Sequence, residues 1–289
     1  MMGDRYRRLR HIQTLDPERD HTEICRIITR YEFPWDYRVG FEMSVLTDLL
    51  VPSISRVLAE SRNFAEAGQK RFDDTMLFEY EMKRSGPDSA HGHDAVRVLN
   101  RIHRGYGISN EDFLYVLASQ TLSPIEWIGN YGWRPLSEHE IRALVASARA
   151  QGRLMGLTGI PDDYEGFQRL LREQRAQRAA FDPANREVAA DVLAVIVNWF
   201  PAPLRPILRV YVPKTIAALL PPELPPLLGL AAPPRWLTKV ARAALRARGR
   251  LLRFLPPRPD SRPYRPKPRS YPRGWTVEDF GPLPRKNAS

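Results

Sequence analysis

Cysteine is nearly absent from this chain of 289 residues, which contains only Cys25. One cysteine excludes an intramolecular disulfide and any zinc or iron–sulfur site built from several thiolates. Cys25 lies in the apolar run 24–28, a setting typical of a buried structural thiol rather than a nucleophile. Any metal chemistry must therefore use histidine or carboxylate ligands, and a reducing compartment fits this composition.

Long uninterrupted apolar segments are also missing. The N-terminus carries basic residues with no apolar stretch behind them, so we expect neither a signal peptide nor an N-terminal membrane anchor. Between residues 192 and 232 the apolar stretches are broken by prolines and arginines, which does not suit a helix that crosses a membrane. The sequence predicts a cytoplasmic protein, with peripheral membrane association left open.

Carboxylates are scarce toward the C-terminus. From Pro233 onward there are 15 Lys and Arg against three Asp and Glu, so the net charge of +11 comes from this region. Aromatic residues are interleaved with these cations, namely Trp236, Phe254, Tyr264, Tyr271 and Trp275. The tail could bind an anionic membrane surface or simply remain solvated. Nucleic acid is disfavoured as a partner because no nucleic-acid-binding motif accompanies the charge.

The alternation typical of β-strands occurs nowhere, whereas helical periodicity and helix-capping residues recur. We predict an all-α fold with helices at 20–31, 37–62, 65–84, 88–104, 110–130, 138–156, 162–180 and 184–199. Ser109, Ser137 and Asp88 are predicted N-caps. Pro52 and Pro124 should kink or divide the helices that contain them.

The chain is predicted to have three parts. Residues 1–235 would form one helical domain, in which broken helical turns replace regular helices from 201 to 234, where prolines are frequent. Residues 236–255 read as a basic amphipathic helix. Residues 256–289, rich in proline and arginine, would be extended or disordered.

His103 has the most informative surroundings of the six histidines. Val96, Leu99 and His103 are spaced i, i+3 and i+7, which places the imidazole on the inward face of the predicted helix. A neutral imidazole there could bind a metal, or it could be a hydrogen-bonded core residue. His91 and His93 form a pair that could bind zinc, but no third ligand is evident and a solvated loop is the preferred interpretation.

Arg71 and Thr75 are four residues apart and therefore share one face of the helix predicted for 65–84. An arginine and a hydroxyl on one face suit an anionic or oxygen-bearing ligand. The alternative is an ordinary surface helix in which Arg71 pairs with Asp74.

Several short motifs, in order along the chain, resemble the MpaB-type oxygenases. They are LDPERDH (15–21), YEFPWD (31–36), VPSIS (51–55), KRFDDT (70–75), ISNEDFLY (108–115), GWRPL (132–136) and MGLTGIP (155–161). The resemblance covers roughly residues 10–235. This family shares its catalytic domain with the latex clearing proteins, which are helical haem b enzymes that cleave carbon–carbon double bonds of polyisoprenoids with dioxygen.

The resemblance implies a haem b cofactor and roles for three residues. His103 matches the histidine that ligates the haem iron, and Arg71 and Thr75 match the Arg-x-x-x-Thr pair of the haem pocket, with catalytic and cofactor-binding roles. Latex clearing proteins have a lysine just before this threonine, where the present chain has Asp74. This departure makes distal coordination of the iron by that residue doubtful.

The family's glutamate base has no assigned counterpart, and Glu60 and Glu79 are only nearby candidates. We therefore predict an oxidoreductase, a haem b-dependent oxygenase that acts with dioxygen on a hydrophobic small-molecule alkene. Removal of residues 256–289 should leave haem content nearly intact. Two alternatives remain, which are a haem protein with another oxidative activity, such as peroxide-dependent oxidation, and a non-enzymatic helical module that binds lipids or anionic partners.

Overall fold

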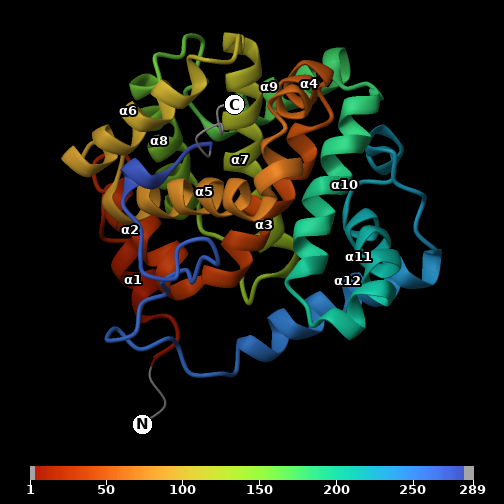
Figure 1. Ribbon diagram of the computed structural model, residues 1–289. Coiled ribbons are helices and arrows are strands. Elements are labelled where there is room, and N and C mark those ends of the chain that lie inside the picture. The colour runs from red at the N-terminus through yellow and green to blue at the C-terminus, as the bar shows by residue number, and fades with distance from the viewer. Residues whose placement is uncertain (1–3, 283–289) are drawn as a thin grey trace.

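The computed structural model describes residues 4–282, and it confirms the all-α prediction because no β-strand occurs in that range (Figure 1). The α-helices are α1 (Arg7–Ile12), α2 (His21–Ile27), α3 (Pro34–Asp48), α4 (Pro52–Ser61), α5 (Asn63–Ser85), α6 (Ala90–His103), α7 (Asn110–Tyr131), α8 (Glu138–Leu154), α9 (Tyr164–Arg178), α10 (Pro183–Asn198), α11 (Arg205–Leu219) and α12 (Arg235–Leu252). A π-helical turn, Ile28–Glu32, extends α2, and short 3₁₀ turns occur at Ala202–Leu204, Pro225–Leu228 and Val277–Asp279.

The helix N-termini largely follow the capping residues in the sequence. Ser109 and Ser137 accept hydrogen bonds from backbone amides in the first turns of α7 and α8, as predicted. The prediction for α6 was wrong by one residue. Ser89, not Asp88, is the N-cap, because its backbone is extended and its hydroxyl accepts the amide N–H of Gly92 at 2.9 Å.

The prolines have different effects in different helices. Pro52 begins α4 and separates it from α3, as predicted. Pro124 lies inside a continuous α7, and Pro213 inside a continuous α11 where only broken turns were predicted. At Pro124 the helix is held by close packing, since a Cβ added at Gly40 of α3 would lie only 2.5 Å from the proline Cα. Tertiary packing thus preserves helices that local preferences would interrupt.

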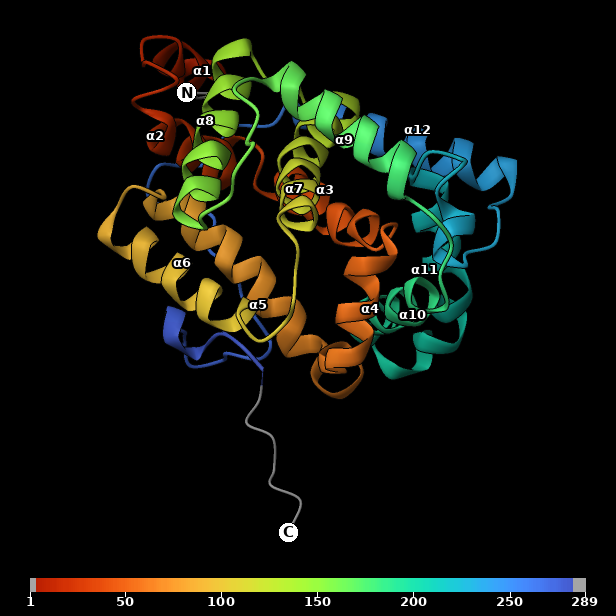
Figure 2. The same ribbon diagram turned by 90° about the horizontal axis from the view of Figure 1, so that it is seen from above.

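The helix pair α3 and α7 lies at the centre of the molecule (Figure 2). α8 packs against α2 and α7, while α10 packs against α4 and α5. α11 and α12 pack against each other on the outside, and α12 also contacts α7. Four apolar clusters fill the spaces between these layers. No helix within residues 4–282 is long and apolar enough to cross a membrane.

Residues 256–282 contain no α-helix, only turns and one 3₁₀ turn within an otherwise irregular segment, and they pack along the helical body (dark blue in Figure 1). The amide of Tyr264 donates to the carbonyl of Arg30 at 2.8 Å, and the amide of Ser270 donates to the Asp73 carboxylate at 2.8 Å. Val277 is buried in the cluster between α5 and α6. This segment is therefore part of the folded body. Residues 283–289, the end of the tail considered above, lie outside the described residues.

Candidate functional site

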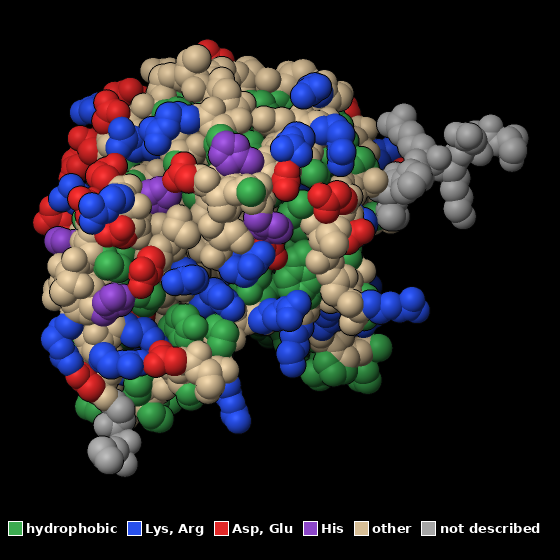
Figure 3. Space-filling view, turned by 90° about the vertical axis from the view of Figure 1, so that its left-hand side faces the viewer, with side chains coloured by type: hydrophobic (Ala, Val, Ile, Leu, Met, Phe, Trp, Pro, Cys, Tyr) green, Lys and Arg blue, Asp and Glu red, His purple; other side chains and the backbone are tan. Residues whose placement is uncertain are grey.

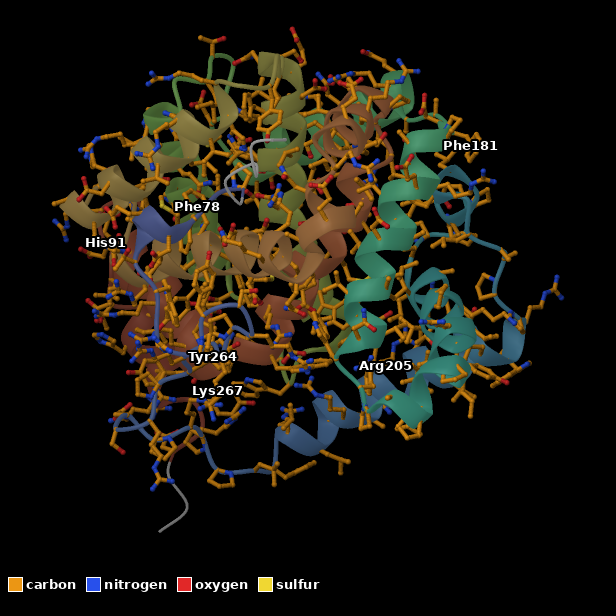
Figure 4. The ribbon with its side chains drawn as sticks, viewed as in Figure 1. Phe78, His91, Phe181, Arg205, Tyr264 and Lys267 are labelled. Atoms are coloured by element: carbon orange, nitrogen blue, oxygen red, sulfur yellow. The ribbon has the colours of Figure 1, made fainter. Side chains whose placement is uncertain are left out.

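A cavity of about 230 Å³ is enclosed by helices α3 to α7, α8 and the end of the described chain. Most of its wall is apolar, and Phe78 of α5 is one such wall residue, labelled in Figure 4. The polar side chains that line it include the three residues singled out from the sequence, Arg71, Thr75 and His103. The structure thus brings α5 and α6 together so that all three predicted residues line one cavity.

His103 occupies the last turn of α6, with its imidazole against Phe113 at a ring-centroid distance of 5.1 Å. Burial, and then the nearby positive charge of Arg71, lower the pKa of His103 to about 4. The imidazole is therefore neutral at physiological pH, the form that binds metals. Its Nδ1 atom is buried without a hydrogen-bond partner within residues 4–282. This geometry does not match the hydrogen-bonded core histidine that the sequence left as an alternative.

Arg71 and Thr75 lie one turn apart on α5 and contact each other. The Arg71 guanidinium donates to the Thr75 hydroxyl, which in turn donates to the Arg71 carbonyl at 3.1 Å. Burial lowers the pKa of Arg71, and the guanidinium carbon lies 5.4 Å from the ring centroid of Phe64. Arg71 forms no ion pair in the described part of the chain, so the surface pair with Asp74 considered above is not formed.

Asp74 instead binds three other groups. It accepts from Lys70 Nζ at 2.9 Å, from the amide of Gly281 at 3.1 Å and from the hydroxyl of Tyr271. These contacts hold residues 270–282, called here the C-terminal strap, against α5. Phe280 of the strap forms part of the cavity wall. Sequence reasoning missed this wall because its contacts join residues about 200 positions apart.

Asp48, at the end of α3, is a second residue that the sequence did not reveal. Its side chain is buried, lines the same cavity, and has one carboxylate oxygen without a hydrogen-bond partner within residues 4–282. Burial raises the pKa of Asp48 from 3.8 to about 7, against the lowering effect of Ser119 and Gln120. Perturbed carboxyls in cavities are typical of functional sites. No local pattern marks Asp48, since its burial depends on the packing of α3 on α7.

The two glutamates considered as bases lie elsewhere. Glu60 is exposed on α4 and does not line this cavity. Glu79 is buried and lines a neighbouring cavity of about 310 Å³, where it accepts a hydrogen bond from Tyr37 and lies 3.6 Å from Lys83.

His91 and His93 belong to the first turn of α6, so the predicted loop is wrong at this point. The cap formed by Ser89 starts the helix before them. His91, at the outer edge of the molecule in Figure 4, binds the Glu81 carboxylate at 2.9 Å, and His93 is exposed. Within residues 4–282 no three His, Cys, Asp or Glu side chains gather as metal ligands.

Comparisons with known proteins place the chain in a family. The family described as ER-bound oxygenase mpaB/B'/Rubber oxygenase, catalytic domain, matches residues 37–254. The ER-bound oxygenase mpaB' of Penicillium brevicompactum is 27% identical over 202 residues, which are 64% of this chain and 48% of that protein. The ER-bound oxygenase mpaB of Penicillium roqueforti is 26% identical over 232 residues, 70% of this chain and 78% of that protein. The chain spans about half the length of the P. brevicompactum relatives it matches.

The fold also resembles a solved structure. Latex clearing protein in its closed state superposes with a TM-score of 0.60 over 90% of this chain and 75% of the other, at 15% identity. The segment matched by the family includes Arg71, Thr75 and His103. The chain belongs to the family of the ER-bound oxygenase mpaB/B' and rubber oxygenase catalytic domain.

Proposed function

We propose that this protein is a haem b-dependent oxygenase, in which His103 is the axial iron ligand. The observation that carries the proposal is a neutral, partly buried imidazole in one mostly apolar cavity with an arginine that forms no ion pair in residues 4–282. Family membership adds support, because the family and the curated relatives are named as oxygenases.

The residues present fit a haem group. The iron requires a neutral nitrogen ligand from the protein, and His103 is held neutral by its surroundings. The propionates are anionic, and Arg71 offers a partly buried cation that forms no ion pair within residues 4–282. The porphyrin plane is apolar, as is most of the cavity wall. When bound, haem supplies the redox chemistry with dioxygen.

The protein's own residues would hold and orient the reactants. A ring nitrogen of His103 would bind the iron, while Arg71 would orient a propionate or stabilise a negatively polarised oxygen. Thr75, fixed by its hydrogen bonds to Arg71, would offer a hydroxyl beside it. Asp48 has a pKa near neutrality and would exchange a proton at its carboxyl group under working conditions. The apolar wall would exclude water and accept a hydrophobic alkene.

The specific reaction proposed is cleavage of a carbon–carbon double bond in an isoprenoid-like or other hydrophobic alkene, which yields carbonyl products. A hydrophobic small molecule and dioxygen are the partners in this proposal. The cytoplasmic location inferred from the sequence is part of the same proposal.

The test is the cofactor content of the protein purified after expression with haem supplied. We expect about one haem b per chain, identified by a pyridine haemochrome assay, and a Soret band. A colourless protein that is folded by circular dichroism and does not take up added haemin would refute the proposal.

A further inference from the structure

The exposed apolar side chains of this protein are concentrated on one structural unit. Ten of the twelve large apolar side chains exposed within residues 4–282 lie between residues 200 and 255. They include Ile207, Val210 and Tyr211 of α11 and Trp236, Val240 and Leu251 of α12, which are between 47% and 67% exposed. Scattered exposed apolar residues are ordinary, but a concentration of this kind indicates an interaction surface. We call α11, α12 and the turn between them the hairpin.

The apolar surface is a consequence of how α12 is fixed to the body. Gly249 lies against the backbone at the end of α7, where an added Cβ would approach the Tyr131 carbonyl oxygen to 2.4 Å. Arg242 donates to the carbonyl of Ala218 at 3.0 Å and so joins α12 to α11. With this side of the helix fixed inward, Trp236, Val240 and Leu251, at i, i+4 and i+15, form a stripe on the outward side.

The charge of the hairpin region is almost entirely positive. Between Asp191 and Asp260 the sequence has eleven Lys and Arg and a single carboxylate, Glu223. The exposed cations Lys239, Arg246 and Arg250 form no ion pair in the described part of the chain. The opposite face of the molecule is different, because acidic and basic side chains are interspersed over much of it (Figure 3).

Two aromatic residues of the segment 256–282, Tyr271 and Trp275, are hydrogen-bonded to α5. Tyr271 donates its hydroxyl to Asp74, and the Trp275 indole donates to Glu81 at 2.9 Å. No large apolar side chain of residues 256–282 is exposed, so the cations of this segment have no exposed apolar side chain from the same segment beside them. The hairpin combines exposed aromatic and aliphatic side chains with cations that have no carboxylate partner within residues 4–282.

We propose that the hairpin binds the surface of an anionic phospholipid bilayer. The stripe of Trp236, Val240 and Leu251 would enter the headgroup region, and Lys239, Arg246 and Arg250 would contact lipid phosphates. An interfacial helix needs an apolar face flanked by long cationic side chains, whose charged ends can remain at the phosphate level. The inference is independent of haem and goes beyond the proposed oxygenase activity.

The experiment is co-sedimentation of the full chain with vesicles at low salt. The vesicles contain phosphatidylcholine, either alone or with about one third phosphatidylserine. The wild-type protein should bind the anionic vesicles and bind the neutral ones much more weakly. The triple variant Lys239→Gln, Arg246→Gln, Arg250→Gln should bind the anionic vesicles on the order of a hundredfold more weakly, since each cation contributes about fivefold.

Matched variants separate the hairpin from the rest of the surface. The tail variant Arg262→Gln, Lys267→Gln, Arg273→Gln removes the same charge from exposed positions. Its loss of binding should be at least about tenfold smaller than that of the hairpin charge variant. Trp236→Gln, Val240→Gln, Leu251→Gln should abolish sedimentation. Phe181→Gln, at an exposed site before α10 and outside the α12 stripe (labelled in Figure 4), should not. Circular dichroism and melting temperature serve to verify that each variant is folded.

Three results would overturn the proposal. The first is that the wild-type protein does not bind anionic vesicles. The second is that the hairpin and tail charge variants lose binding equally. The third is that the wild-type protein binds no lipid but forms a dimer in its absence, and that the Trp236→Gln, Val240→Gln, Leu251→Gln variant is monomeric. The last result would assign the same stripe to contact with a second copy of the chain.

Discussion

The two neighbouring cavities of this protein differ in how completely their buried polar groups are hydrogen-bonded within residues 4–282. In the cavity of about 310 Å³, Tyr37 donates to Glu79, Lys83 lies 3.6 Å from Glu79, and Lys83 donates to Ser147 at 3.2 Å. In the His103 cavity, by contrast, one nitrogen of His103 and one oxygen of Asp48 lack partners, and Arg71 lacks a carboxylate within the described residues.

This difference distinguishes polar groups that stabilise the fold from polar groups that are open to a ligand. Burial of a polar group costs free energy unless the group is hydrogen-bonded, so a network serving stability alone satisfies its members. Groups left open in an apolar cavity represent a cost that a ligand can offset. The comparison predicts that variants in the Glu79 cavity will mainly lower stability, whereas variants in the His103 cavity will mainly lower ligand binding.

Loss of the C-terminal strap should have the largest effect. Deletion of residues 270–289 removes the buried Val277 and Phe280 and exposes the carboxylate of Asp74. We expect the free energy of unfolding to fall by roughly 5 kcal/mol or more, from lost apolar burial alone. Haem uptake should also fall, because Phe280 forms part of the cavity wall. This reverses the expectation from sequence that the tail is dispensable.

Chemical denaturation and haem titration of the truncated protein would measure both effects. Phe280→Ala is a milder variant for the case in which the truncated chain does not fold. Wild-type stability and haem affinity in both proteins would contradict the assigned role of the strap.

The second-largest effect on stability is expected in the hydrogen-bonded network of Tyr37, Glu79 and Lys83. Lys83→Met leaves the Glu79 carboxylate buried without its cation and should destabilise the protein by about 3–5 kcal/mol. Haem content per folded chain should be unchanged. The double variant Glu79→Leu, Lys83→Met should recover much of the loss, as measured by urea denaturation, because neither charge then remains buried. Failure of the double variant to recover any stability would argue against this explanation.

Asp48 should give the protein a pH-dependent stability. Its pKa is raised from 3.8 to about 7 in the folded state, so the folded protein binds this proton more tightly than the unfolded chain. Stability contributed by the neutral carboxyl is present below about pH 4 and is lost as pH rises to about 7. Asp48→Asn removes this loss. The stability of the variant relative to wild type should grow by up to about 4 kcal/mol across that range.

Denaturation of both haem-free proteins at several pH values would measure this difference. Asp112→Asn is a suitable comparison, because Asp112 lines the same cavity but is bound by Ser53 and Arg178. A constant difference between Asp48→Asn and wild type from pH 4 to pH 7 would contradict the raised pKa.

The smallest effect on stability is expected at Arg71. Arg71→Met removes a partly buried cation with no ion-pair partner in the described chain, so the free energy of unfolding should change by less than about 1 kcal/mol. Haem affinity should nevertheless fall at least about tenfold, since a charge-assisted contact is lost. Haemin titration and urea denaturation of the same preparations would show whether these two effects separate.

The sequence predicted those features that depend on local periodicity. The spacing of Val96, Leu99 and His103 placed the imidazole on the inner side of α6, and the four-residue interval placed Arg71 beside Thr75. Features that depend on distant packing were not predicted. Asp48 acquires its perturbed pKa only when α3 packs on α7, and the strap meets Asp74 only in the folded chain.

The packing of residues 256–282 against the helical body was missed for the same physical reason. The extended segment was judged from its own composition, which is too poor in apolar residues to form a core. Its stability comes instead from the burial of Val277 and Phe280 against the body, and from α5 carboxylates that bind its amide and indole donors. Complementarity of this kind is visible only when both surfaces are known.

The central claim is tested most directly by the haem spectrum of His103→Ala beside that of His93→Ala. The two histidines lie on the same helix, but His103 lines the cavity and His93 is exposed. The account predicts that His103→Ala loses or strongly shifts the Soret band while keeping its helical circular dichroism, and that His93→Ala retains the wild-type spectrum. An unchanged Soret band in His103→Ala at full haem occupancy would contradict the assignment of His103 as the iron ligand.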